Sequence, residues 1–459
     1  MITARIFSGR SYIVLGLARS GAAAVEMLLA SGARVVAWDE NDVVREPFVG
    51  LCDLADPLSL DLRGFDGVVL SPGIPLNSHP IKEHCESFGV PIIGDLELFS
   101  LARDELPAHQ VVGVTGTNGK STTVALLHHI LSEANIPSVL VGNIGVPILS
   151  ADPLDEGGVY VLELSSYQID LTVSLDCDLA LLLNITPDHL DRYDNDFKKY
   201  CASKIRMFEM QSSNSIAFFP TDLVSSFETA NSLKPHGIAY ELELDLSAMG
   251  LDRQEEWPSL NGPHNLQNAK AAISLANALK IPHEKIAKAL KSFPGLPHRL
   301  QTIGVQDGVT YVNDSKATNS ESSAYALASF PPDPAKNGGD PRIHWIVGGI
   351  QKEESLGPCE RYFCNVRAAY TIGKSGPLIS KLLEPYLLVE QSETLAKALE
   401  KARLRARPGE LVLLSPACSS FDQFRDFEAR GEHFQELINP ILAAPKNIQL
   451  TNKKGRRHE

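Results

Sequence analysis

The sequence predicts an α/β protein made of three successive domains, each with a mostly parallel sheet covered by helices. Two observations carry this prediction. The chain has 459 residues, which exceeds the usual size of one domain and favours two to four of them. Short runs of β-branched and apolar residues also alternate with amphipathic stretches in three separate sets, which is the pattern of strands joined by crossover helices.

Each set contains four predicted strands. The first set is Tyr12–Gly16, Arg34–Trp38, Gly67–Ser71 and Val90–Ile93; the second is Val111–Val114, Ser138–Val141, Val159–Glu163 and Leu179–Asn184; the third is Val309–Asn313, Ile343–Val347, Ala368–Ile372 and Glu410–Ser415. The residues rich in proline and glycine at 331–341 are expected to form a surface loop between two strands of the third set.

The domain boundaries follow from these sets. We expect domains at 1–98, 99–302 and 303–445, followed by a basic, disordered tail at 446–459. The four cations of this tail, Lys453, Lys454, Arg456 and Arg457, are more often a solvated chain end than a binding patch.

Composition excludes several classes of function. The formal net charge of −14 opposes binding to a nucleic-acid backbone, which depends on Lys and Arg. Because no apolar run reaches the roughly 18 residues of a membrane span, and no leader pattern opens the chain, we expect a cytoplasmic protein without membrane insertion. The seven cysteines are odd in number and form no Cys-x-x-Cys pair, which indicates reduced thiols.

A phosphate-binding loop is predicted at Gly113–Thr122, after a strand and before a helix that starts at Lys120. Glycines let backbone N–H groups face a polyphosphate, and the helix N-terminus contributes its positive dipole end. Lys120 would neutralise the terminal phosphates, and a neighbouring hydroxyl would reach Mg²⁺. The candidate nucleotide-binding residues are Gly116, Thr117, Asn118, Gly119, Lys120, Ser121 and Thr122. Val114 departs from the strict pattern, which has glycine there.

Two further candidates lie just after predicted strands, where open α/β sheets bind ligands. Glu163 ends one strand, and His189 follows the next. Beside a phosphate loop they are plausible magnesium ligands, since Mg²⁺ prefers oxygen ligands next to phosphates. Alone, each is more often an ordinary strand-end acid or loop histidine.

The turn Gly16–Gly21 resembles a dinucleotide fingerprint in which Ala18 replaces the middle glycine, and Asp39 ends the next strand. An NAD-dependent enzyme is therefore an alternative. A P-loop ATPase without an amino-acid acceptor is another, because the phosphate loop alone predicts only nucleotide binding.

Six motifs in order resemble those of the Mur ligases over about residues 11–440. They are Thr115–Thr122, Glu163–Gln168, Asn184–Arg192, Gly262–Asn268, Pro297–Arg299 and Asn313–Asn319. The resemblance implies an N-terminal Rossmann-like domain that binds a UDP-substrate, a central P-loop ATPase domain, and a C-terminal Rossmann-like domain that binds an amino acid. It is strongest with the branch that adds D-glutamate to UDP-N-acetylmuramoyl-L-alanine through an acyl phosphate, in peptidoglycan precursor synthesis. A folylpolyglutamate-type ligase is the alternative with similar chemistry.

The resemblance also implies roles for individual residues. Lys120, His189 and Lys204 would be catalytic, with ATP and two Mg²⁺ ions as cofactors. Ser121, Glu163, His189 and Lys204 would surround the ions, Lys204 as the lysine that this family carbamylates. Without that modification, Lys204 would be a surface or phosphate-contacting lysine.

The remaining roles concern the ligands. Asn268, Arg299 and Asp314 match residues around ATP; in isolation they would be a helix residue, part of a surface ion pair and a helix cap. The UDP-substrate would contact Asp39, Ser71, Gly73 and Asn143. D-Glutamate would contact Thr318, Lys352, Ser420 and Phe427, although Gly348–Lys352 departs from the family pattern. We expect a monomer.

Overall fold

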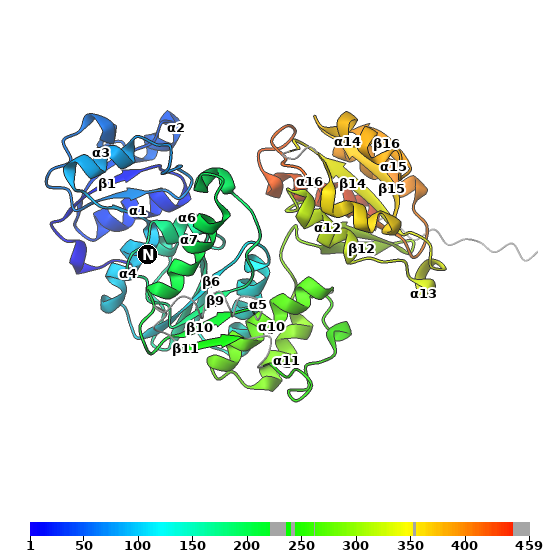
Figure 1. Ribbon diagram of the computed structural model, residues 1–459, viewed down its shortest axis with the longest axis horizontal. Coiled ribbons are helices and arrows are strands. Elements are labelled where there is room, and N and C mark those ends of the chain that lie inside the picture. Colours follow the sequence, from blue (N-terminus) through cyan, green and yellow to red (C-terminus); the bar gives the residue numbers. More distant parts are fainter. Residues whose placement is uncertain (221–235, 240–243, 261, 352–354, 444–459) are drawn as a thin grey trace, which may run out of the picture. The chain divides into compact units, whose positions relative to one another are not determined.

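The structure is a computed structural model that describes residues 1–220, 236–239, 244–260, 262–351 and 355–443 (Figure 1). The chain forms two compact units, Met1–Phe293 and the part from Pro294 onward. Lys352 and the predicted tail at 446–459 lie outside the described residues. The domain boundaries at 98 and 302 stay predictions.

The first unit begins with a five-stranded parallel sheet of order β3-β2-β1-β4-β5. Its strands are β1 (Ser11–Leu15), β2 (Arg34–Trp38), β3 (Asp53–Leu54), β4 (Gly67–Leu70) and β5 (Ile92–Ile93). Its helices are α1 (Arg19–Ala30), α2 (Asp42–Arg45), α3 (Ile81–Phe88) and α4 (Asp95–Ala102). Strands β1 and β4 are almost wholly buried, as expected when helices cover both faces of a parallel sheet.

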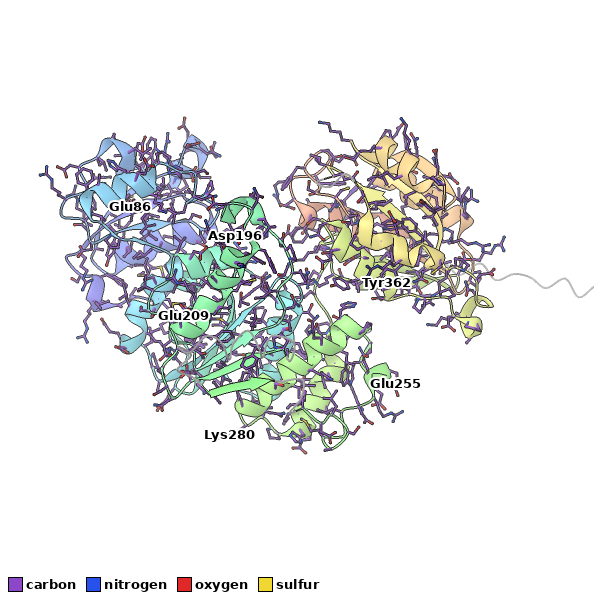
Figure 2. The ribbon with its side chains drawn as sticks, viewed as in Figure 1. Glu86, Asp196, Glu209, Glu255, Lys280 and Tyr362 are labelled. Carbon is purple, nitrogen blue, oxygen red and sulfur yellow. The ribbon has the colours of Figure 1, made fainter. Side chains whose placement is uncertain are left out.

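The same unit continues with a six-stranded parallel sheet of order β11-β10-β9-β6-β8-β7. Its strands are β6 (His109–Thr115), β7 (Ser138–Gly142), β8 (Gly158–Glu163), β9 (Leu179–Leu182), β10 (Ile216–Phe219) and β11 (His236–Ala239). Its helices are α5 (Lys120–Glu133), α6 (Ser166–Asp170), α7 (Phe197–Glu209), α10 (Pro263–Ala278) and α11 (His283–Ser292). The labelled Asp196 and Glu209 mark the two ends of α7 (Figure 2).

One continuous core joins these two sheets. It contains Val14 of β1, Met27 of α1, Phe99 of α4 and Tyr160 of β8, all buried. The opposite face of the second sheet packs on α5, α10 and α11 in a separate core. The shared core explains why both sheets belong to one compact unit.

The second unit holds a six-stranded sheet of order β12-β13-β17-β14-β15-β16; among its described strands, β12 and β13 pair antiparallel and the other pairs are parallel. Its strands are β12 (Gln301–Gln306), β13 (Val309–Asn313), β14 (Ile343–Gly348), β15 (Val366–Ile372), β16 (Val389–Glu393) and β17 (Leu411–Leu414). Its helices are α12 (Ser320–Ala328), α13 (Pro334–Asn337), α14 (Gly376–Leu383), α15 (Leu395–Arg405) and α16 (Phe427–Ala443). Two buried clusters cover its two faces.

The predicted fold class is confirmed, since three α/β sheets follow one another along the chain. The twelve predicted strands all correspond to strands, but five were missed: β3, β10, β11, β12 and β16. Strand β12, for example, lies at the sheet edge and alternates weakly in burial. The predicted loop at 331–341 contains the short helix α13, which Asp333 caps.

Two expectations from composition can be compared with the structure. All seven cysteines are free thiols. Among the described residues, no helix combines the length and apolarity that a bilayer crossing requires.

Candidate functional site

The predicted phosphate loop is formed as a turn between strand β6 and helix α5. Gly116 and Gly119 have φ values of +151° and +85°, which side-chain-bearing residues rarely adopt. A Cβ on Gly119 would collide with the Oδ1 of Asn268. The predicted residue Asn268, on α10, therefore lies against the loop. Helix α5 starts at Lys120, so its N-terminal N–H groups face the turn, an arrangement suited to an anion.

The chain following β9 holds the loop in shape. The Asn184 side chain accepts hydrogen bonds from the backbone N–H groups of Thr117 (3.2 Å) and Asn118 (2.9 Å). The Thr117 hydroxyl donates to the Thr186 carbonyl (3.0 Å) and lies 3.1 Å from the Tyr200 hydroxyl. Asn184 and Tyr200 were not predicted as site residues, although Asn184 opens one of the motifs and Tyr200 lies four residues before Lys204.

Two lysines meet at one carbonyl of the loop. The Nζ of Lys120 donates to the carbonyls of Gly116 (2.8 Å) and Thr117 (2.9 Å), and the Nζ of Lys204 donates to the same Gly116 carbonyl (2.9 Å). Lys204 is only 2% exposed, so the alternative of a surface lysine is wrong. Burial, and secondarily the charge of Lys120, lowers the pKa of Lys204 to about 7.

Glu163 lies beside the loop because strand register places it there. Its Cα pairs with Val114 of β6 and with Gly142 of β7. Its Oε1 accepts from the Asn143 amide at 2.8 Å. Its Oε2 is buried and has no hydrogen-bond partner among the described residues. A carboxylate oxygen left in this state beside a phosphate loop is a candidate cation ligand.

Helix α5 adds hydroxyls at the phosphate loop, since Ser121 and Thr122 are both buried in its first turn. In the described part of the chain, no three His, Cys, Asp or Glu side chains come together as a metal site. The protein thus offers one carboxylate and hydroxyls, a donor set that fits Mg²⁺ only with phosphate and water oxygens.

His189 is not part of the buried group that Glu163, Ser121 and Thr122 form. Its side chain is 53% exposed and lies 3.5 Å from the Asp188 carboxylate. Its ring contacts Tyr167, which stacks on Tyr193, and Tyr193 contacts Tyr200 beside the loop. An aromatic row therefore links His189 to the phosphate loop, so His189 belongs to the same side of the sheet.

Of the predicted UDP-binding residues, Asp39 follows β2, Ser71 and Gly73 follow β4, and Asn143 follows β7 of the second sheet. The Asp39 carboxylate accepts from the backbone N–H groups of Leu17 (2.8 Å) and Asn41 (3.0 Å), which orders the turn after β1. Gly16 has φ of +89°, and a Cβ there would meet the side chain of Ser71 at 2.7 Å. The turns after β1 and β4 are thus closely packed against each other. Gly73 belongs to the exposed part of the second turn.

In the second unit, Asp314 and Arg430 define a buried C-terminal polar cluster that also contains Ser315, Ser415 and Cys418. Asp314 Oδ1 accepts from the Leu300 backbone (3.1 Å), and Oδ2 accepts from the Ser415 hydroxyl (2.7 Å). Because Asn319, and not Asp314, caps α12, the helix-cap alternative for Asp314 is wrong. Burial raises the pKa of Asp314 to about 7.

Arg430 connects two segments that carry predicted D-glutamate residues. Its guanidinium donates to the hydroxyl and carbonyl of Ser315 (both 2.9 Å) and to the carbonyl of Cys418 (3.1 Å). Thr318 follows the first segment, and Ser420 follows the second. Ser315 also donates to the carbonyl of Phe427 at 2.8 Å. Arg430 was missed because nothing in its local sequence marks it.

Two known domain families match the chain, one within each of its two units. The model of the Mur ligase middle domain matches residues 114–276, and that of the Mur ligase, glutamate ligase domain matches residues 298–418. The UDP-N-acetylmuramoylalanine–D-glutamate ligase of Novosphingobium aromaticivorans is 53% identical over 443 residues, which cover 96% of this chain and 97% of that protein.

Two further known proteins are similar to this chain. The enzyme of the same name from Sphingopyxis alaskensis is 49% identical over 444 residues, covering 96% of this chain and all (100%) of that protein. The solved structure of the UDP-N-acetylmuramate–alanine ligase of Thermotoga maritima has a TM-score of 0.54 at 16% identity, covering 93% of this chain and 98% of that one. At this identity the likeness shows the fold alone.

Proposed function

The chain belongs to the Mur ligase family, and on this premise we propose that it joins D-glutamate to UDP-N-acetylmuramoyl-L-alanine at the expense of ATP, in peptidoglycan precursor synthesis. The observation that carries the proposal is the 53% identity, over 96% of this chain, to a relative named for that ligation. The aligned residues extend through both units.

The reaction requires activation of a carboxylate, because a free carboxylate is a poor electrophile. An oxygen of the L-alanine carboxylate attacks the γ-phosphorus of ATP, and ADP leaves. The D-glutamate amine then attacks the acyl phosphate, loses a proton and displaces phosphate from a tetrahedral intermediate, which leaves an amide. Catalysis depends on placing the reactants and on neutralising phosphate charge.

The phosphate loop is assigned to ATP. The backbone of Gly116–Gly119 and the side chain of Lys120 hold the phosphates, and Asn268 borders them from α10, as its approach to Gly119 supports. Ser121, Thr122 and the unpartnered oxygen of Glu163 would hold one Mg²⁺ against these phosphates. Bound there, the ion would offset the negative charge of the phosphates.

Glu163, His189 and Lys204 are assigned to the second Mg²⁺. Burial beside Lys120 favours a neutral Lys204 amine, and a neutral amine can add to CO₂ to give a carbamate. That modification would turn a buried cation into an oxygen ligand, which suits a lysine placed 2.9 Å from a loop carbonyl.

The substrate residues are assigned by unit. In the first, Asp39, Ser71, Gly73 and Asn143 take the UDP-substrate. In the second, Arg299 and Asp314 contact ATP, while Thr318, Lys352, Ser420 and Phe427 take D-glutamate. One copy of the chain carries all of these residues, so we propose that the protein acts as a monomer. ATP and a UDP-sugar are both cytoplasmic metabolites, so we place the reaction in the cytoplasm.

Phosphate release tests the proposal. Purified protein is given ATP and Mg²⁺ with UDP-N-acetylmuramoyl-L-alanine, with D-glutamate or with both, and L-glutamate and D-aspartate replace D-glutamate in matched reactions. We expect release only with both substrates and a clear preference for D-glutamate. Release that needs neither substrate would indicate a simple ATPase, and release with a pteroyl substrate and L-glutamate would indicate the folylpolyglutamate-type reaction.

A further inference from the structure

Arg192 joins the two sheets of the first unit through a pair of backbone carbonyls. It belongs to the short 3₁₀ helix η6 (Leu190–Tyr193), which follows β9 of the second sheet. Its Nη2 donates to the Gly73 carbonyl at 2.8 Å, and its Nη1 donates to the Ile74 carbonyl at 3.1 Å. Both carbonyls lie in the turn that follows β4 of the first sheet. One guanidinium on a segment of the second sheet therefore binds two consecutive carbonyls in a turn of the first sheet's chain.

Two neighbouring contacts fix this arrangement. The Arg192 guanidinium lies over the Tyr167 ring, 4.4 Å from its centroid, which orients the plane of the fork. The Asn77 amide donates to the Asp191 carbonyl at 3.2 Å, so a further hydrogen bond joins the same two segments at the residue before Arg192. Lysine could not replace Arg192 here, because a single ammonium does not offer two fixed parallel donors.

On the side of the first sheet, the turn packs closely on the turn after β1. A cavity of about 190 Å³ separates it from the second sheet, and its walls include Ile74, Leu76, Tyr167, Leu171 and Arg192. Where apolar side chains do not fill the space under a turn, its position depends on the polar contacts that remain. On the side of the second sheet, those contacts come from Arg192 and Asn77.

We infer that Arg192 is a positioning residue for the UDP-substrate: it holds the Ser71–Asn77 turn in the conformation that receives this substrate. The inference rests on the proposed function, which assigns Ser71 and Gly73 to the UDP-substrate. Arg192 itself donates to the protein backbone and does not need to touch the reacting atoms.

Steady-state kinetics of three variants test the inference. Arg192→Ala removes both donors, and Arg192→Lys keeps the charge without the fork. Arg206→Ala is the matched control, because Arg206 also donates to two backbone carbonyls, those of Asp170 and Thr172, but within the second sheet's own domain. The KM for UDP-N-acetylmuramoyl-L-alanine should rise about tenfold or more in Arg192→Ala and less in Arg192→Lys. The KM for ATP should change less than about twofold in all three.

Amide hydrogen exchange of peptides covering residues 71–77 supplies a readout that does not need turnover. Exchange should accelerate in Arg192→Ala and stay at the wild-type rate in Arg206→Ala. If the wild-type chain shows no ligase activity, the proposed function fails, and exchange alone then decides whether Arg192 holds the turn. Unchanged exchange in Arg192→Ala, or equal rises in the KM values for both substrates, would overturn the inference.

Discussion

The phosphate loop and the C-terminal polar cluster hold their charged groups in different ways. In the loop, Lys120 of the strand-turn-helix connection and Lys204 of α7, which lies 88 residues beyond Gly116, donate to the same backbone carbonyl. In the cluster, Asp314 and Arg430 are buried within hydrogen bonds from segments far apart in the sequence. The loop thus gathers two cations on one backbone carbonyl, an arrangement suited to an anion, whereas the cluster holds buried groups of both signs in hydrogen bonds that support its unit. Mutations should separate activity from stability accordingly.

The largest expected effect is on activity, in the loop. Lys120→Ala removes the cation assigned to the ATP phosphates, so the rate of phosphate release should fall about a thousandfold while the melting temperature changes little. The control is Lys198→Ala, at an exposed position on α7. Full activity of Lys120→Ala would exclude the loop from the mechanism.

The next effect is on stability, in the cluster. Arg430→Met leaves the carbonyls of Ser315 and Cys418 without their donor, which should lower the free energy of unfolding of the second unit by about 3 kcal/mol. Urea unfolding measures it. Arg425→Met, which removes an exposed guanidinium paired with Asp426, should change the free energy of unfolding by less than about 0.5 kcal/mol. Equal losses in both variants would contradict a supporting role for the cluster.

A third variant tests the carboxylate beside the loop. Glu163→Gln keeps an acceptor for the Asn143 amide but removes the negative charge, so the Mg²⁺ concentration that gives half-maximal activity should rise about 10- to 100-fold. Glu209→Gln, at the exposed end of α7 (Figure 2), is the control. An unchanged Mg²⁺ requirement in Glu163→Gln would remove this residue from the cation site.

The last prediction depends on pH and concerns Asp314. Its pKa is raised from 3.8 to about 7 by burial, so between these values the folded state binds more protons than the unfolded state. The contribution of Asp314 to stability is therefore present at low pH and is lost as pH rises toward 7, with a slope of up to about 1.4 kcal/mol per pH unit. Asp314→Asn should lack this slope in urea unfolding between pH 4.5 and pH 7.5, whereas the exposed Asp307→Asn should keep it.

Sequence patterns captured the parts of this protein that local residues determine. The strands of the buried sheets, and the turn from β6 into α5, follow from apolar runs and glycines a few residues apart. The predicted placement of Glu163 at a strand end is confirmed, and β-sheet register explains why it meets the loop. Its role, like the roles of the other predicted site residues, stays a prediction.

The residues that were missed act through long-range contacts. Asn184 and Tyr200 reach Thr117 across 67 and 83 residues of sequence. Arg430 lies 115 residues from Ser315. Short edge strands such as β16, with the sequence Val-Glu-Gln-Ser-Glu, carry too few apolar residues to be recognised. In each case the defining partner comes from a distant segment that periodicity cannot identify.

The hydrogen bonds of Lys120 to the carbonyls of Gly116 and Thr117 have a thermodynamic consequence for nucleotide affinity. The loop itself thus supplies two acceptors for its own lysine. If the ATP phosphates bind this ammonium, as proposed, they compete with these carbonyls, so binding would be an exchange of partners and its net free energy would be smaller than that of a bare ammonium meeting phosphate. The same exchange would ease release of the spent nucleotide, because the lysine would return to partners that are already in place.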